Sequence, residues 1–194
     1  MNKLKSLLKD IAIGLLLALF VRTFFIQAYK IPTGSMIPTL LIGDHIIVNR
    51  LSYGLRFPYL GYIIKWNDVK IGDIVVFEFP KDRSKDFIKR VIANEGDLVE
   101  IRNKIVYVNG KKIEDKWAFF SDNEIYPSRD NWGPERVPEG HIFVLGDNRD
   151  ESNDSRFWGF VPKENVKGKA FLIYFSIDYE SGKIRNKRLF SLIK

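Results

Sequence analysis

The feature that most constrains this chain is an apolar run near its amino end. The segment Ile11–Val21 carries no charge, and Arg22 is the one charged residue from there to Ala28. A helix over 11–28 is about 27 Å long at 1.5 Å per residue, which is just enough to cross a bilayer core. We therefore expect a transmembrane anchor at 11–28, with Arg22 reaching toward the headgroups on the far side.

Lysines in the preceding stretch, residues 1–10, fix the expected orientation. Lys3, Lys5 and Lys9 place this short stretch in the cytoplasm, and residues 29–194 then lie on the outer side. Two alternatives stay open. A cleaved secretory signal needs small residues at a cleavage site, which RTFFIQAYKIP does not offer. A buried helix of a globular domain is also compatible with so short an apolar run.

The absence of cysteine excludes several kinds of site. A chain without cysteine has no thiol nucleophile, no disulfide framework and no thiolate zinc site. The two histidines, His45 and His141, are too few for a multi-histidine metal centre. Both begin apolar, strand-like segments, so we interpret them as structural. We expect no metal and no cofactor.

The net charge of +7 leaves nucleic acid and anionic lipid as conceivable attractors. The basic residues are spread along the chain instead of forming a block, which is typical of a solvated surface. We expect no nucleic acid partner. The competing hypothesis is a basic module, tethered to a membrane, without enzymatic activity.

The remainder of the chain predicts a mainly β fold with antiparallel sheets. Short segments rich in β-branched and aromatic residues alternate with turn residues, and they cover 45–49, 73–79, 87–93, 104–110, 141–147 and 169–177. Asn109–Gly110 predicts a tight hairpin turn. The aromatic segment Leu51–Trp66 is interrupted by Gly and Pro, so we expect no regular strand there. It is either a loop packed on the core or a lip that dips into the membrane interface.

The segment Ile31–Leu40 contains a candidate nucleophile. Pro32 and Pro38 stiffen the loop around Ser35, and Gly34 allows close approach of a ligand. The Ser35 N–H and the Thr33 hydroxyl are suited to stabilise an oxyanion. On spacing alone, a serine in such a turn is more often structural.

Four segments in this order resemble the conserved boxes of type I bacterial signal peptidases. They are GSMIPTL from Gly34, GDIVVFEFP from Gly72, DFIKRVIANEGD from Asp86 and GDNRDESNDSRFWGFV from Gly146. The resemblance implies a Ser–Lys serine protease with Ser35 as nucleophile and Lys89 as general base. It also implies a two-part β fold, with a variable insertion at 97–140 in a catalytic domain over 29–194. The implied location is the outer face of the bacterial inner membrane, near the bilayer and the export machinery.

A lysine can act as a base only when its amine is neutral. Its usual pKa near 10.4 must fall by about three units, and burial lowers it because desolvation disfavours the charged form. If 87–92 is a strand, Phe87, Lys89 and Val91 share one apolar face while Arg90 points the other way. The absence of a G-x-S-x-G elbow argues against a hydrolase triad. The fourth box, which begins at Gly146 and is called the acidic box below, and the anchor argue against a Ser–Lys protease of the self-cleaving repressor type.

The resemblance further assigns supporting residues. Ser152 is implied to hydrogen-bond the lysine amine, and Asp154 and Arg156 to form an ion pair beside the site. The substrates are implied to be signal-peptide-bearing precursors, bound as an extended strand and cut after small-x-small motifs. The implied pocket residues are Tyr29, Ile31, Met36, Leu40, Asp86, Phe87 and Ile88.

Overall fold

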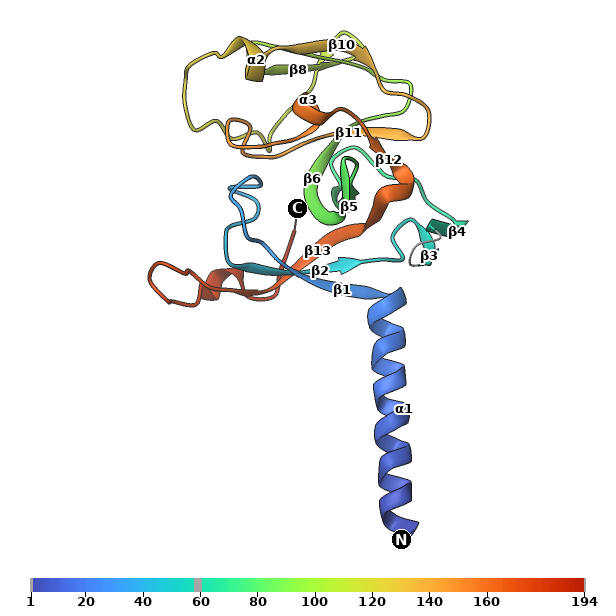
Figure 1. Ribbon diagram of the computed structural model, residues 1–194. Coiled ribbons are helices and arrows are strands. Elements are labelled where there is room, and N and C mark those ends of the chain that lie inside the picture. The colour runs from blue at the N-terminus through green and yellow to red at the C-terminus, as the bar shows by residue number, and fades with distance from the viewer. Residues whose placement is uncertain (1, 58–60, 194) are drawn as a thin grey trace.

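A computed structural model describes residues 2–57 and 61–193. One long helix projects from a body made almost entirely of β-structure (Figure 1). Within the described part, the other helical elements are single turns: α2 (Pro127–Asp130), α3 (Ser155–Trp158), η1 (Lys163–Asn165) and η2 (Asn186–Arg188). The predicted mainly β, antiparallel fold class is confirmed.

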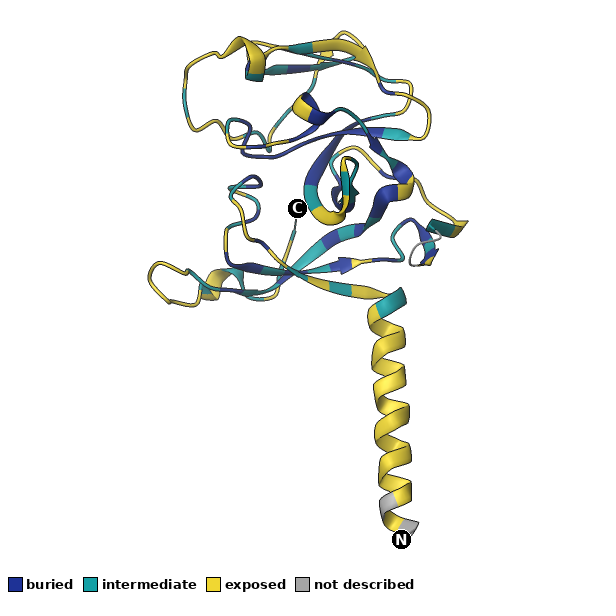
Figure 2. Ribbon diagram, in the orientation of Figure 1, coloured by how far each residue is buried: buried dark blue, intermediate teal, exposed yellow. Residues whose placement is uncertain are grey.

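The helix α1 (Asn2–Phe24) corrects the predicted anchor over 11–28. It ends at Phe24, and the next residues turn into a strand. No helix among residues 2–57 and 61–193 is both long and apolar enough to cross a membrane. The reason is its charges: any 18 consecutive residues of α1 include Lys9, Asp10 and at least one more charged side chain. Figure 2 shows the helix exposed along most of its length.

An eight-stranded antiparallel sheet forms the larger part of the body. Most of its strands come from the segments that the sequence predicted. Their order is β1 (Ile26–Lys30), β2 (Asp44–Asn49), β13 (Val166–Ser176), β5 (Ile74–Phe79), β6 (Asp82–Asn94), β11 (His141–Leu145) and β12 (Val161–Pro162), with β14 (Ser191–Leu192) paired to β13.

Apolar clusters cover this sheet on both faces. Along β5, Val75 and Phe77 belong to one cluster with Val91, while Ile74 and Val76 belong to a second one with Met36. Successive strand residues point to opposite faces, so a strand buried on both sides is apolar throughout, as IVVF is here. The candidate site therefore has a packed layer on either side of its supporting strands.

A smaller, four-stranded sheet occupies much of 97–140, the predicted insertion. Its order is β10 (Trp132–Arg136), β7 (Leu98–Arg102), β8 (Ile105–Val108) and β9 (Lys111–Lys112). Asn109 and Gly110 join β8 to β9 with positive φ angles of 52° and 76°. Two positive φ values in a two-residue loop define the tight hairpin turn that the sequence predicted.

The prediction of no regular strand within Leu51–Trp66 is wrong. This segment contains two paired antiparallel strands, β3 (Gly54–Phe57) and β4 (Gly61–Lys65), and residues 58–60 between them lie outside the described residues. Gly54 has the backbone of Ile64 so close that a Cβ would lie 2.2 Å from its carbonyl oxygen. The glycine that argued against a strand therefore permits the pairing. Buried Arg56 docks the hairpin on the body through an ion pair with Glu78 at 2.8 Å.

Candidate active site

Ser35 lies in a loop that joins β1 to β2 and is closed at its base by backbone hydrogen bonds. The Ile31 N–H donates to the Asp44 carbonyl at 2.8 Å, and the Gly43 N–H donates to the Ile31 carbonyl at 3.0 Å. Met36 and Leu40 anchor the loop, because both are fully buried in the cluster between it and the sheet. Ser35 is thereby held at 8% exposure, with its hydroxyl directed inward.

Lys89 comes from β6 and meets this hydroxyl. A hydrogen bond joins Lys89 Nζ to Ser35 Oγ at 2.7 Å, across 54 residues of sequence. The amine also donates to the Ile88 carbonyl at 3.0 Å and lies 5.7 Å from the centre of the Phe87 ring. Phe87 and Val91 belong to one apolar cluster with Lys89 between them, as the alternation predicted. The lysine is only 4% exposed.

The surroundings of this amine make its neutral form more accessible than in an ordinary lysine. Burial lowers the pKa of Lys89 from 10.5 to about 8, since desolvation penalises the ammonium. The charges of Asp154 and Asp147 oppose this shift, and that of Arg156 adds to it. Within the described chain no carboxylate lies within ion-pair distance of Lys89 Nζ. An appreciable fraction of the lysine is therefore neutral near pH 8, already hydrogen-bonded to a hydroxyl.

The segment 146–156 forms the support beneath the serine. The Asn148 N–H donates to the Ser35 carbonyl, and the Asn148 side-chain amide donates to the Gly34 carbonyl, both at 3.1 Å. Gly146 is packed so closely that a Cβ there would lie 2.2 Å from Ser152 Oγ and 2.4 Å from the Ser35 carbonyl oxygen. Only glycine fits between these two serines.

The structure treats the implied supporting residues differently. Asp154 and Arg156 form a two-pronged ion pair, with Nε–Oδ1 at 2.9 Å and Nη2–Oδ2 at 3.0 Å. The implied hydrogen bond from Ser152 to the lysine amine is wrong here. Ser152 Oγ is buried without a hydrogen-bond partner in the described chain, because the amine is directed to Ser35 Oγ and the Ile88 carbonyl instead.

The two groups predicted to stabilise an oxyanion are donors that make no hydrogen bond within the described residues. Neither the Ser35 N–H nor the exposed Thr33 hydroxyl has an intramolecular hydrogen-bond partner among the described residues. Free donors beside a nucleophile are what a developing oxyanion requires. Their role stays a prediction.

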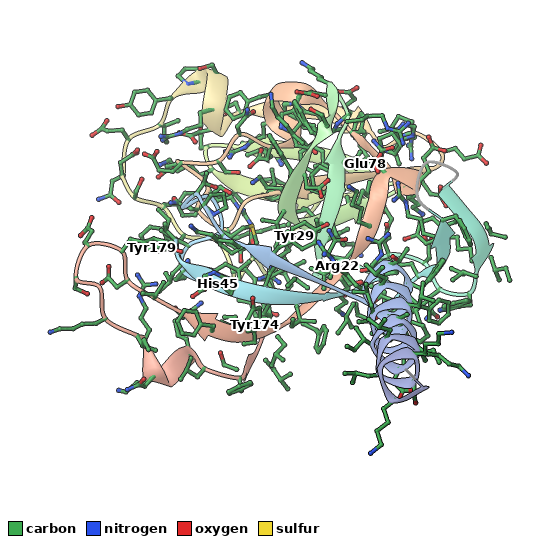
Figure 3. All side chains as sticks on the ribbon, turned by 60° about the horizontal axis from the view of Figure 1, so that its bottom comes forward. Arg22, Tyr29, His45, Glu78, Tyr174 and Tyr179 are labelled. Carbon is green, nitrogen blue, oxygen red and sulfur yellow. The ribbon has the colours of Figure 1, made fainter. Side chains whose placement is uncertain are left out.

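Tyr29, Asp86 and their neighbours lie where the resemblance places the substrate. The Tyr29 hydroxyl donates to Asp86 Oδ2 at 3.0 Å, so β1 and β6 approach each other beside the site although three strands separate them in the sheet. Figure 3 shows Tyr29 on β1, between this strand and the pair β5–β6. Burial and the adjacent Asp86 raise the pKa of Tyr29, which keeps the phenol protonated.

The apolar pocket residues divide by exposure. Phe87 and Ile88 are half-buried, whereas Ile31, Met36 and Leu40 are enclosed. Met36 and Leu40 have no surface open to a substrate in this conformation, because the loop turns them into the core. Their role as pocket lining stays a prediction.

Arg90 is a residue whose environment sequence reasoning missed. Alternation correctly placed Arg90 on the other face of the strand from Lys89. Its side chain is only 1% exposed and forms a two-pronged ion pair with Asp147 at 2.8 Å. Asp147 also accepts a hydrogen bond from the Thr39 hydroxyl at 2.5 Å. An arginine next to the lysine and an aspartate at the head of the acidic box were the only sequence signals for this pair.

The histidines have packing contacts consistent with structural roles. The His45 ring lies edge-on to Tyr174 and Phe175 at centroid distances of 5.9 and 5.4 Å. His141 Nδ1 lies 2.8 Å from the Glu139 carbonyl oxygen.

Comparison with known proteins places this arrangement in a family. Residues 4–175 match the family described as signal peptidase, peptidase S26. The chain belongs to this family. A signal peptidase I from Pseudomonas fluorescens is 37% identical, over 84% of this chain and 69% of the relative. One from Aquifex aeolicus is 38% identical, over 84% and 80%, respectively.

The family assignment makes the chain a hydrolase and a peptidase of the signal peptidase class. A solved signal peptidase I from Enterococcus faecalis is 29% identical over 54% of this chain and 98% of its own, with a TM-score of 0.45. The match to the signal peptidase family ends at residue 175, so the last part of the chain lies beyond it.

Proposed function

We propose that this protein removes signal peptides from exported precursors, with Ser35 as the nucleophile and Lys89 as the general base. The observation that carries the proposal is the 2.7 Å contact between Ser35 Oγ and a buried amine that has no carboxylate partner in the described chain. A lysine in this setting is available as a base, whereas a salt-bridged lysine keeps its proton. The relatives named signal peptidase I support the substrate class.

In the proposed mechanism, neutral Lys89 takes the Ser35 proton as Oγ attacks the scissile carbonyl. The resulting oxyanion receives hydrogen bonds from the Ser35 N–H and the Thr33 hydroxyl. The Lys89 ammonium then gives its proton to the leaving amine, and an acyl-enzyme forms on Ser35. Lys89 next activates a water, which hydrolyses the ester and releases the signal peptide.

Substrate selection is proposed to follow from the narrow space beside the dyad. A precursor lying as an extended strand between 29–31 and 86–88 forms backbone hydrogen bonds with both segments. Enclosed Ile31 and half-buried Ile88 leave little depth for side chains at the first and third positions before the cut. Small residues at these positions are therefore preferred, and a bulky one at either is rejected.

A processing assay with matched controls tests the chemistry. Purified wild-type protein, Ser35→Ala and Lys89→Ala are incubated with a precursor that carries a small-x-small site, and mature product is measured. Both variants are expected to lose processing while circular dichroism shows an unchanged fold. The exposed Ser121→Ala and Lys111→Ala serve as controls. Processing by Ser35→Ala at the wild-type rate would refute the proposed nucleophile.

We further propose that the protein acts at the outer face of a bacterial cell membrane, near the bilayer and the export machinery. The hairpin β3–β4 supports a lipid contact, since Ile63, Ile64 and Trp66 are 57, 55 and 50% exposed although Arg56 fixes the hairpin to the body. Replacing these three side chains by serine is expected to slow processing in lipid vesicles more than in detergent. Equal rates in vesicles would contradict the lipid contact.

A further inference from the structure

The carboxyl-terminal tail, residues 177–193, folds back onto the loop that carries Ser35. Its last strand β14 pairs with β13, and the Ile193 N–H donates to the Phe171 carbonyl at 2.9 Å. Ile193 packs on the apolar cluster that contains Met36 and Leu40. This tail lies outside the residues that match the family, and the proposed mechanism assigns it no role.

Arg188 makes polar contacts between the tail and the loop, in addition to the hydrogen bond that Arg185 Nη1 donates to the Ile42 carbonyl at 2.9 Å. Its Nη2 donates to the Thr39 carbonyl at 2.9 Å, and its Nε donates to Asp44 Oδ1 at 3.0 Å. Nη2 also donates to Asp44 Oδ2, so the guanidinium binds the carboxylate in a bidentate manner. Asp44 is fully buried, and its carbonyl closes the base of the loop at Ile31. One side chain therefore holds both the base and the far turn of the loop.

Thr39 connects this contact to the strand of the base. Its carbonyl oxygen accepts from Arg188, while its hydroxyl donates to Asp147, which is ion-paired with Arg90. Arg90 directly follows Lys89 on β6. The turn after Ser35 is thus held from the tail on one side and from the strand that carries Lys89 on the other.

We propose that Arg188 is a positioning residue for the Ser–Lys pair, and that the tail sets the position of Ser35 Oγ relative to Lys89 Nζ. This inference rests on the proposed function. Without Arg188, the loop keeps its apolar anchors but loses two hydrogen-bonded restraints on its polar side. A displacement of about 1 Å between reacting groups costs up to about a hundredfold in rate.

The test compares kcat and KM for Arg188→Ala with those for Lys187→Ala. Lys187 is the exposed neighbour, so its variant removes the same charge from the same turn without touching the loop. We expect Arg188→Ala to lower kcat by about tenfold to a hundredfold with KM unchanged within about twofold. We also expect guanidinium ion at non-denaturing concentration to restore part of the activity. A kcat equal to that of Lys187→Ala overturns the proposal.

Arg188→Ala leaves a buried carboxylate without its cation and can fail to fold. Arg188→Lys then decides, because an ammonium can pair with Asp44 but cannot reproduce the fork that also reaches Thr39. A lowered kcat in folded Arg188→Lys supports the proposal, and a wild-type kcat overturns it. Activity in Ser35→Ala refutes the proposed function. If Ser35→Ala is inactive while folded Arg188→Ala and Arg188→Lys keep the wild-type kcat, only the role of the tail is refuted.

Discussion

Two largely buried lysines, one in the large sheet and one in the turn between β7 and β8, have opposite electrostatic environments. Lys89, in the large sheet, contacts a hydroxyl and a carbonyl, and burial lowers its pKa to about 8. The Lys104 side chain, beside the small sheet, is 12% exposed and lies 3.0 Å from carboxylate oxygens of both Asp122 and Asp150. Burial lowers the pKa of Lys104 too, but these carboxylates outweigh it and leave the pKa raised.

The difference shows that burial alone does not make a base. Both amines are removed from most of the solvent, and only the one without a carboxylate neighbour loses affinity for its proton. Lys104 serves the fold by linking segments of the small sheet region, whereas Lys89 is disfavoured as an ammonium and is therefore suited to chemistry. The following predictions test this contrast, from the largest expected effect to the smallest.

Replacing the base is expected to have the largest effect. Lys89→Met should lower kcat/KM for precursor processing by a factor on the order of 10⁴. It should also raise the free energy of unfolding at pH 6 by about 3 kcal/mol, because a lysine whose pKa falls from 10.5 to about 8 destabilises the fold while it is charged. Precursor assays and urea denaturation measure the two quantities. A simultaneous loss of activity and stability would contradict the contrast.

The same substitution in the small sheet region should do the opposite. Lys104→Met leaves Asp150 and Asp130 buried with one cation fewer, which is expected to lower the free energy of unfolding by about 2 kcal/mol. The processing rate of the folded variant should stay within about threefold of wild type, because no contact of Lys104 reaches Ser35 or Lys89. Denaturation and rate are compared in the same preparation.

The pH dependence of the processing rate and that of the stability should both report the lowered pKa of Lys89. Below pH 8 the rate is expected to fall about tenfold per pH unit, since only neutral Lys89 accepts the Ser35 proton. Between about pH 8 and 10.4, the unfolded chain retains a proton that folded Lys89 has lost, so Lys89 contributes an increase in stability with rising pH. Lys89→Met should lack that increase. A rate midpoint near 6.5 would point to a histidine instead.

The smallest expected effect concerns the distant charges around Lys89. The charge of Asp154 raises the pKa of Lys89, so Asp154→Asn should move the midpoint of the rate profile to lower pH. Arg156, left without its partner, acts in the same direction. The profile of Asp82→Asn, changed at the exposed turn end of β6, should keep the wild-type midpoint. A shift to higher pH in Asp154→Asn would contradict this account.

Local patterns were sufficient to predict most strands of the large sheet, whereas the pairing of Ser35 with Lys89 was implied by the resemblance to a family. Alternation in β6 placed Phe87, Lys89 and Val91 on one face, and that depends on adjacent residues only. The same rule could not predict that Arg90 is buried. Both faces of the strand are covered, so a residue on either face can be buried. The hairpin β3–β4 was not predicted, because Gly54 belongs to a residue type that commonly interrupts strands. In the structure, Gly54 allows the backbone of Ile64 to approach closely.

Other features depend on contacts between distant segments, which no local pattern contains. Arg188 meets Thr39 and Asp44 across 149 and 144 residues of sequence. The lysine amine bonds to Ser35 and leaves Ser152 Oγ without a hydrogen bond in the described chain, an outcome that depends on the packing of three separate segments. The end of the first helix was predicted too late in the sequence, because residues after Phe24 that hydropathy counted as helical belong to strand β1.

Gly146 has a consequence for how variants of this protein can be found. The glycine carries no reactive group, yet even one methyl would collide with the Ser35 backbone and with Ser152. In a saturation library selected for processing, codon 146 should return glycine alone, while the neighbouring exposed Glu151 should return most amino acids. Within residues 146–156, the lowest tolerance to substitution is thus expected at a residue that has no side chain.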